Sequence, residues 1–191
     1  MLGIDPGVSR CGYGCVRRDP GSDPAFRALC AGVITTAPAD PLPERLAELA
    51  RELGDLVREV SPDVVVVERV FFQANARTAM SVGQASGLAL VAAAQAGCEV
   101  AQYTANEVKQ AVTGYGAAGK EQVQRMVAAL CGLSAHPRPP DAADALALAI
   151  CHLSLTPGRR RVAAALARQA RQREEPSPPD DRFLPLEEVG R

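Results

Sequence analysis

Val64-Val65-Val66-Val67-Glu68 places four consecutive valines before a carboxylate. The run is too short for a helix, and β-branched residues favour strands. A strand that is apolar at every position is buried on both faces, so this stretch predicts the central strand of a layered fold. Glu68 then lies at the carboxyl end of that strand, where it is either an ordinary solvent-exposed glutamate or part of a site.

A three-stranded meander is expected before this strand. Strands are predicted over residues 1–4, 12–18 and 27–36, because turn residues separate them at Asp5-Pro6-Gly7 and across 19–24. Asp5 either initiates the first turn or belongs to a functional site at the strand ends.

Helices and one more strand make up the rest of the expected domain. Leucines at spacings of three and four predict an amphipathic helix over 42–57, with its acidic side in water. Residues 75–96, rich in Ala, Ser and Gly, predict a closely packed helix. A strand is expected at 99–103, and helices are expected at 105–112, 120–130 and 141–153. This order predicts an α/β fold in which helices flank a mixed five-stranded sheet.

The chain is expected to divide once. Residues 1–156 are predicted to form a single domain, and residues 157–191 an Arg-rich extension that is partly helical and then mobile. No run of 18 uninterrupted apolar residues and no signal-peptide pattern occur, which predicts a cytoplasmic protein. Six cysteines without a Cys-x-x-Cys pair, beside two histidines, make a zinc site unexpected; the cysteines are interpreted as reduced and mostly buried.

The charges are unevenly distributed, although the net charge of -1 by itself does not indicate a nucleic-acid-binding protein. Residues 40–63 hold seven acids and three arginines, whereas residues 69–138 hold six bases and three acids. The second stretch can therefore face a polyanion. Among 21 basic residues the only lysines are Lys109 and Lys120. A compact ammonium beside a phosphate would explain this choice, and chance would also explain it.

Asp141 and Asp144 are three residues apart on the last predicted helix, so both carboxylates project from one face. Asp141 would also suit an N-terminal cap, but capping does not explain Asp144, which precedes the apolar run 145–150.

Asp5, Glu68, Asp141 and Asp144 can converge on one cleft, since they lie at strand ends and on one helix face. Two unit charges about 4 Å apart repel by roughly 4 kcal/mol at an effective dielectric constant near 20. Divalent ions with oxygen ligands remove this penalty, and Mg²⁺ suits a carboxylate site shared with a phosphate. The four acids therefore predict metal-assisted phosphodiester chemistry, in which two ions activate a water and stabilise the leaving oxygen.

Five motifs in the same order, spanning residues 1 to about 154, resemble the RuvC family of Holliday-junction resolvases. They are Gly3-Ile4-Asp5-Pro6-Gly7, Glu68 followed by Val70-Phe71, Val108-Lys109-Gln110, the glycine-rich linker 113–119 with Lys120, and Asp141-Ala142-Ala143-Asp144-Ala145-Leu146-Ala147. The resemblance implies a ribonuclease-H-like fold, a homodimer, a branch-migration helicase complex as partner and a nucleoid-associated location. It also implies paired nicking of four-way DNA junctions in recombination and repair, with two Mg²⁺ or Mn²⁺ ions per active site and 5′-phosphate products.

The resemblance also assigns roles to single residues. The four acids look like the catalytic metal ligands, Lys109 and Lys120 look like phosphate contacts, and Phe71 resembles an aromatic that stacks on a base at the crossover. From the residues alone, Phe71 and Phe72 are either core wedges or stacking elements.

Two further expectations concern DNA and the dimer. Ala74 stands where relatives often place a basic residue, so Arg77 or Arg69 is expected to take that role. The expected dimer seam is the small-residue helix 75–96, in which Gly83 and Gly87 recur four residues apart.

Two other classes of protein fit parts of the pattern. An actin-like-fold phosphotransferase can open with an Asp-x-Gly turn, but it needs a second domain of similar size, for which 191 residues are expected to leave no room. A non-catalytic junction-binding module would keep the basic surface and lose metal ligands, whereas all four acids are present. The expectation is therefore a metal-dependent endodeoxyribonuclease.

Overall fold

The computed structural model describes residues 1–19, 21–69 and 76–156, and within the last range it describes side chains from residue 79 onward. Residues 1–156 form one compact unit. The predicted Arg-rich extension, 157–191, lies outside the described residues and stays a prediction. None of the described helices is long and apolar enough to cross a membrane.

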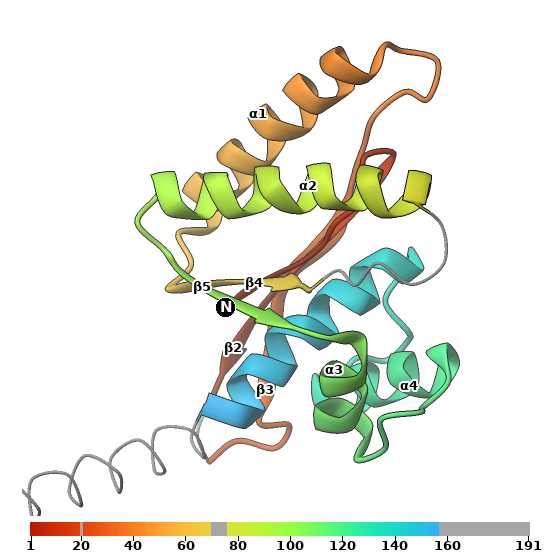
Figure 1. Ribbon diagram of the computed structural model, residues 1–191. Coiled ribbons are helices and arrows are strands. Elements are labelled where there is room, and N and C mark those ends of the chain that lie inside the picture. Colours follow the sequence, from red (N-terminus) through yellow and green to blue (C-terminus); the bar gives the residue numbers. More distant parts are fainter. Residues whose placement is uncertain (20, 70–75, 157–191) are drawn as a thin grey trace, which may run out of the picture. The chain divides into compact units, whose positions relative to one another are not determined.

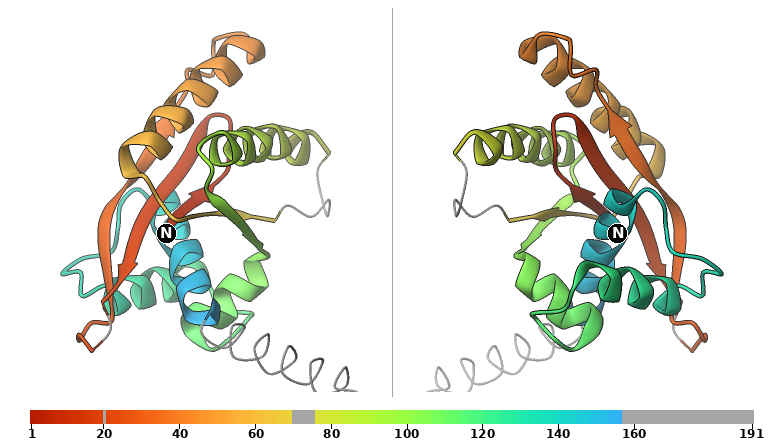
Figure 2. Two further views of the ribbon diagram at one scale, coloured as in Figure 1. Left: turned by 90° about the vertical axis from the view of Figure 1, so that its left-hand side faces the viewer. Right: turned by 90° about the vertical axis from the view of Figure 1, so that its right-hand side faces the viewer.

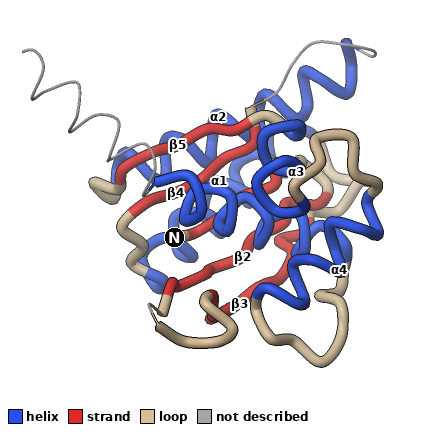
Figure 3. The backbone as a smooth tube through the Cα atoms, turned by 90° about the horizontal axis from the view of Figure 1, so that it is seen from below, coloured by secondary structure: helices blue, strands red, loops and turns tan. Residues whose placement is uncertain are grey.

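A five-stranded sheet in the order β3-β2-β1-β4-β5 organises this unit (Figures 1 and 3). The first three strands, β1 (Leu2–Asp5), β2 (Arg10–Arg18) and β3 (Phe26–Thr35), form the predicted antiparallel meander. On the other side of β1, β4 (Val64–Glu68) pairs with it in parallel, and β5 (Glu99–Tyr103) pairs with β4 in parallel. The expected mixed sheet is confirmed.

Helices cover both faces of the sheet (Figures 1 and 2). One face carries α1 (Leu42–Val60) and α2 (Ala76–Gln95). The opposite face carries α3 (Ala105–Thr113), α4 (Lys120–Leu130) and a helix over residues 140–156. The predicted helices agree with these to within a few residues at their ends.

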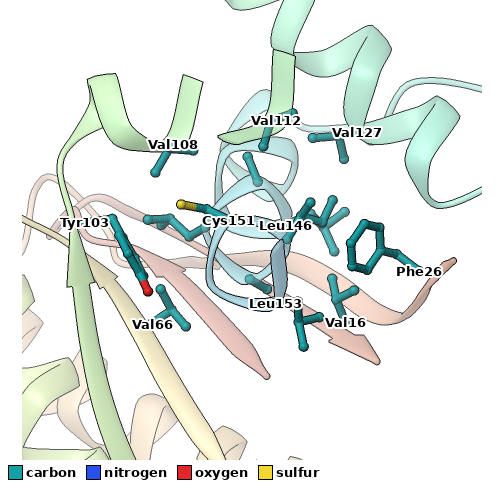
Figure 4. Close-up of a cluster of buried hydrophobic side chains, with 14 of the residues drawn as sticks. Val16, Phe26, Val66, Tyr103, Val108, Val112, Val127, Leu146, Cys151 and Leu153 are labelled. Atoms are coloured by element: carbon teal, nitrogen blue, oxygen red, sulfur yellow. The ribbon is translucent and has the colours of Figure 1, made fainter. Parts of the chain in front are cut away.

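The four valines of β4 divide between two apolar clusters, because successive side chains of a strand point to opposite faces. Val64 and Val66 join the cluster beneath α3, α4 and the 140–156 helix (Figure 4), whereas Val65 and Val67 join the cluster beneath α1 and α2. All four are buried. Each contributes about 1.5–3 kcal/mol relative to an exposed side chain, which explains why the strand contains no polar residue before Glu68.

The same alternation fixes the face on which the acids lie. Leu2 and Ile4 of β1 belong to the cluster beneath α1 and α2, so Asp5 points to the face of the 140–156 helix. By the same count along β4, Glu68 lies on the face of Val66. Two acids at neighbouring strand ends therefore face the helix that carries Asp141 and Asp144.

Glycines in β1 and β2 let the 140–156 helix lie directly on the sheet. A Cβ at Gly3 would collide with the carbonyl oxygen of Ala145, and a Cβ at Gly12 would collide with that of Asp141. Glycine within a strand often marks such a close approach of another backbone. Gly12 sets the position of the Asp141 backbone, a role that its place in the sequence does not indicate.

The cysteines behave largely as expected. All six are free thiols, and Cys11, Cys15, Cys131 and Cys151 are buried. Cys30 is exposed on the edge strand β3 and Cys98 is half-buried.

Candidate active site

A cavity of about 260 Å³ lies at the carboxyl ends of β1 and β4. Its charged lining comes from β1, β4, α3, α4 and the 140–156 helix, and consists of Asp5, Glu68, Lys109, Lys120 and Asp144. The remaining lining is apolar and includes Val108, Val123 and Leu148. Five of the residues predicted from the sequence thus meet in one place.

The topology explains this meeting. β1 and β4 are parallel neighbours in which Ile4 pairs with Val67, so the next residues of the two strands, Asp5 and Glu68, end side by side. The first turns of the 140–156 helix supply Asp144 and Asp141. Asp141 is outside the cavity lining, but its charge acts on Asp5.

The acids carry unbalanced negative charge. Burial raises the pKa of Asp5 from an ordinary 3.8 to about 7, and repulsion from Glu68, Asp144 and Asp141 adds to this shift. Burial also raises the pKa of Glu68, with a further contribution from Asp144. Protons are therefore held in this cavity at a pH where an exposed carboxyl has lost them.

The free energy of unfolding of the metal-free protein is expected to fall as the pH rises from about 4 to 7. In this range the unfolded chain has released the Asp5 proton and the folded chain still holds it. A rise in pH therefore stabilises the unfolded state relative to the folded state. Asp5→Asn should reduce this fall and stabilise the protein at pH 8 by about 2 kcal/mol. This is roughly half of the free energy that the whole pKa shift of Asp5 would give, because Glu68 titrates together with Asp5. Urea denaturation at several pH values, in the presence of a chelator, measures the free energy of unfolding. The exposed Asp40→Asn is the control, and an unchanged pH profile in Asp5→Asn would contradict the expectation.

Two cations pair with the helix carboxylates. Nζ of Lys120 lies 2.8 Å from Oδ2 of Asp144, and this hydrogen bond raises the pKa of Lys120. Arg10 donates from Nε and Nη2 to Oδ2 of Asp141 at 3.1 and 2.7 Å. Burial alone would raise the pKa of Asp141. The hydrogen bonds from Arg10 and from the backbone of Asp141 itself hold that pKa below its ordinary value.

The donor set suits a hard divalent ion, because it offers carboxylate oxygens only. Within the part of the chain that the structure describes, no three His, Cys, Asp or Glu side chains already form a metal-binding group. Lys120 and Arg10 each hold one carboxylate oxygen, Oδ2 of Asp144 and Oδ2 of Asp141. A metal bound by Asp141 and Asp144 would have to share these oxygens with the cations or displace them.

Comparison with known proteins identifies the family. The family model described as crossover junction endodeoxyribonuclease RuvC matches residues 1–152. The chain belongs to the RuvC family. RuvC of Salinispora arenicola is 53% identical over 171 residues, covering 90% of this chain and 97% of that relative. RuvC of Moorella thermoacetica is 50% identical over 161 residues, covering 84% and 95%.

A solved RuvC structure has the same architecture. Thermus thermophilus RuvC in complex with Holliday junction substrate is 38% identical, with a TM-score of 0.75 over 82% of this chain and 94% of that one. The expected ribonuclease-H-like fold is confirmed by this likeness.

Three other residues with predicted roles in this RuvC chain do not line the cavity or cannot be placed. Arg69 is exposed just after β4, and its Nη2 lies 3.5 Å from the carbonyl oxygen of Gln102. Arg77 falls within α2, but its side chain is outside the described residues. Phe71, with Phe72 and Ala74, is also outside them. Their DNA-binding roles stay predictions.

Arg10 is the site residue that sequence reasoning missed. It begins β2 two residues before Gly12, so the two residues share the strand face that the 140–156 helix covers. An arginine at that spacing from a strand glycine was the available signal. This spacing indicates a partner for Arg10 only when Gly12 is known to lie beneath Asp141.

Proposed function

We propose that this RuvC chain resolves four-way DNA junctions by paired phosphodiester hydrolysis, with Asp5, Glu68, Asp141 and Asp144 as its catalytic carboxylates. The observation that carries the proposal is the convergence of three of these acids and two lysines on one cavity, with Asp141 within electrostatic reach. The Thermus relative with the same architecture is described in complex with Holliday junction substrate.

The four carboxylates would hold Mg²⁺ or Mn²⁺, two ions per site. When bound, such ions supply an activated water on one side of the phosphodiester and stabilise the departing 3′ oxygen on the other, which gives 5′-phosphate ends. The raised pKa of Asp5 supports this assignment, because burial and then repulsion from the other three acids disfavour its charge, and Lys120 only partly offsets them. Asp5 and Glu68 are joined to the sheet, so they fix one side of the site.

Lys109 and Lys120 would bind the phosphate that is cut. Both line the cavity, and an ammonium is a compact charge that follows a phosphate as it moves. The Lys120 side chain is largely exposed at 59% although it pairs with Asp144. It can therefore divide its three donors between that carboxylate and an incoming phosphate.

A synthetic four-way junction tests the function directly. Incubation with Mg²⁺ or Mn²⁺ should give two symmetric nicks with 5′-phosphate ends, and a linear duplex of the same sequence should stay uncut. A chelator should stop cleavage and restored metal should return it. Junction binding without cleavage would favour the non-catalytic module, and ATP hydrolysis without DNA cleavage would favour the phosphotransferase.

A homodimer through α2 belongs to the same proposal, since two equivalent sites match the approximate two-fold symmetry of a junction. The helix presents an apolar stripe to solvent: Met80 is 65% exposed and Val91 53% exposed. Between them, a Cβ at Gly83 or Gly87 would meet no described atom within 4 Å apart from its own helix backbone and chain neighbours. This open surface leaves room for a second α2 to approach closely.

Val91→Glu is expected to convert the dimer into a monomer, because a charge buried in the seam has no partner. The expected loss is at least about 3 kcal/mol of dimerisation free energy, or more than a hundredfold in the dissociation constant. Analytical ultracentrifugation measures it. Leu29→Glu is a matched control, since Leu29 is 52% exposed on β3. Equal dimerisation of both variants would move the seam away from α2.

The helicase partner and the nucleoid-associated cytoplasmic location are also proposed, on family membership alone. Neither affects the chemistry assigned to the four acids.

A further inference from the structure

A second hollow of about 590 Å³ lies between α4 and the loop that joins it to the 140–156 helix. Its polar lining consists of Arg125 from α4 with Ser134, His136 and Arg138 from the loop. Leu133 and three alanines complete it. None of these residues lines the acidic cavity.

The charge of this hollow is of one sign. Residues 122–140 contain two arginines and a histidine and no aspartate or glutamate. Arg125 and Arg138 are exposed, and neither forms an ion pair with a described residue. Among the other described arginines, Arg10, Arg17, Arg51 and Arg58 each pair with a carboxylate, whereas Arg18, Arg27, Arg45 and Arg69 form no ion pair with a described residue. The two loop-side arginines are therefore available to an anionic ligand.

Two short connections along the chain limit the distance between this hollow and the acidic residues. Lys120 begins α4, and Arg125 follows five residues later, which is about 7.5 Å along a helix axis. Arg138 precedes Asp141 by three residues, which span at most about 10 Å. Residues 120–138 therefore supply both Lys120 of the acidic cavity and the two arginines of the hollow.

We propose that the Arg125–Arg138 hollow binds the phosphodiester backbone of the same DNA, a few nucleotides from the bond that is cut. The inference rests on the proposed function and adds a second DNA contact to it. Guanidinium groups match phosphate oxygens in a bidentate fork, and the hydroxyl of Ser134 and the ring of His136 add donors. Such contacts position a duplex and carry no sequence information, so the hollow should hold the arm in place for the carboxylates.

Binding of a junction by the double variant R125A/R138A tests this contact. Measured by fluorescence anisotropy in an Asp144→Asn background, the dissociation constant should rise about tenfold or more, equally for junctions of different sequence. The dependence of log affinity on log salt should become shallower by about 2, since two phosphate contacts are lost. With Asp144 restored, cleavage at junction concentrations below the dissociation constant should fall by about the same factor as the affinity.

R51A/R58A is the matched control, because it removes two exposed arginines from α1 and should leave the affinity unchanged. R125K/R138K keeps the charges but loses the bidentate fork, so it should keep the salt slope and lose less affinity than R125A/R138A. An unchanged dissociation constant and salt slope in R125A/R138A would overturn the inference, as would an equal loss in the α1 control. Failure of the proposed function gives a different result from failure of this inference, because the unmodified protein would then leave the junction uncut.

Discussion

Asp144→Asn is expected to reduce junction cleavage by about a thousandfold while it leaves junction affinity within about threefold of the unmodified protein. Asp144 is a proposed metal ligand, and in other enzymes the removal of one preorganised group that stabilises the transition state costs about two to three orders of magnitude in rate. Asn keeps the shape of the side chain and still accepts a hydrogen bond from Lys120, so the fold should persist. Single-turnover cleavage and anisotropy on the same junction measure the two quantities.

Asp55→Asn is the control for this substitution. Asp55 also pairs with a cation, Arg58, but on the exposed surface of α1, and its replacement should change neither rate nor affinity. Joint loss of binding, cleavage and thermal stability in Asp144→Asn would instead assign Asp144 a structural role.

Gly12→Ala is expected to lower the free energy of unfolding by about 2–3 kcal/mol and to impair cleavage strongly. The added Cβ would lie 2.7 Å from the carbonyl carbon of Asp141 and 3.1 Å from its Cβ. Contacts this close force the 140–156 helix to shift, and Asp141 and Asp144 move with it. Urea denaturation measures the stability, and single-turnover cleavage measures the displacement of the acids.

Gly54→Ala gives the opposite expectation. Gly54 lies inside α1, where, apart from the helix's own backbone and the chain neighbours, an added Cβ would meet only the end of the Arg58 side chain, 3.6 Å away. Alanine should stabilise the helix by about 0.5–1 kcal/mol. If Gly12→Ala were as well tolerated as Gly54→Ala, the helix would not rest on β2 as closely as described.

The strand pattern accounts for what could be predicted. Val64 to Val67 required cover on both faces, and the two clusters that receive alternate valines provide it. Parallel pairing of β1 with β4 then brings Asp5 beside Glu68. The four acids could be predicted as site residues because each lies at the end of a strand or helix that the sequence pattern indicates.

Contacts between distant segments account for what could not be predicted. Arg10 and Asp141 are 131 residues apart, and nothing near Arg10 in the sequence indicates a carboxylate partner. Arg125 and Arg138 appeared only as members of a basic stretch, because their shared hollow depends on how the loop after α4 folds back. Local patterns fix elements, whereas the pairing of individual charges depends on packing.

The helix that carries Asp141 and Asp144 has little freedom to adjust. From Ala145 to Cys151 every side chain is buried, and its backbone rests on the glycines of β1 and β2. The backbone that carries its two carboxylates is thus held in place by the core. The nucleic acid is therefore expected to supply the deformation that brings a phosphate to them. Bending an intact duplex by 40–90° costs about 1–6 kcal/mol, so a flexible branch point should reach the carboxylates at a lower cost than a continuous double helix.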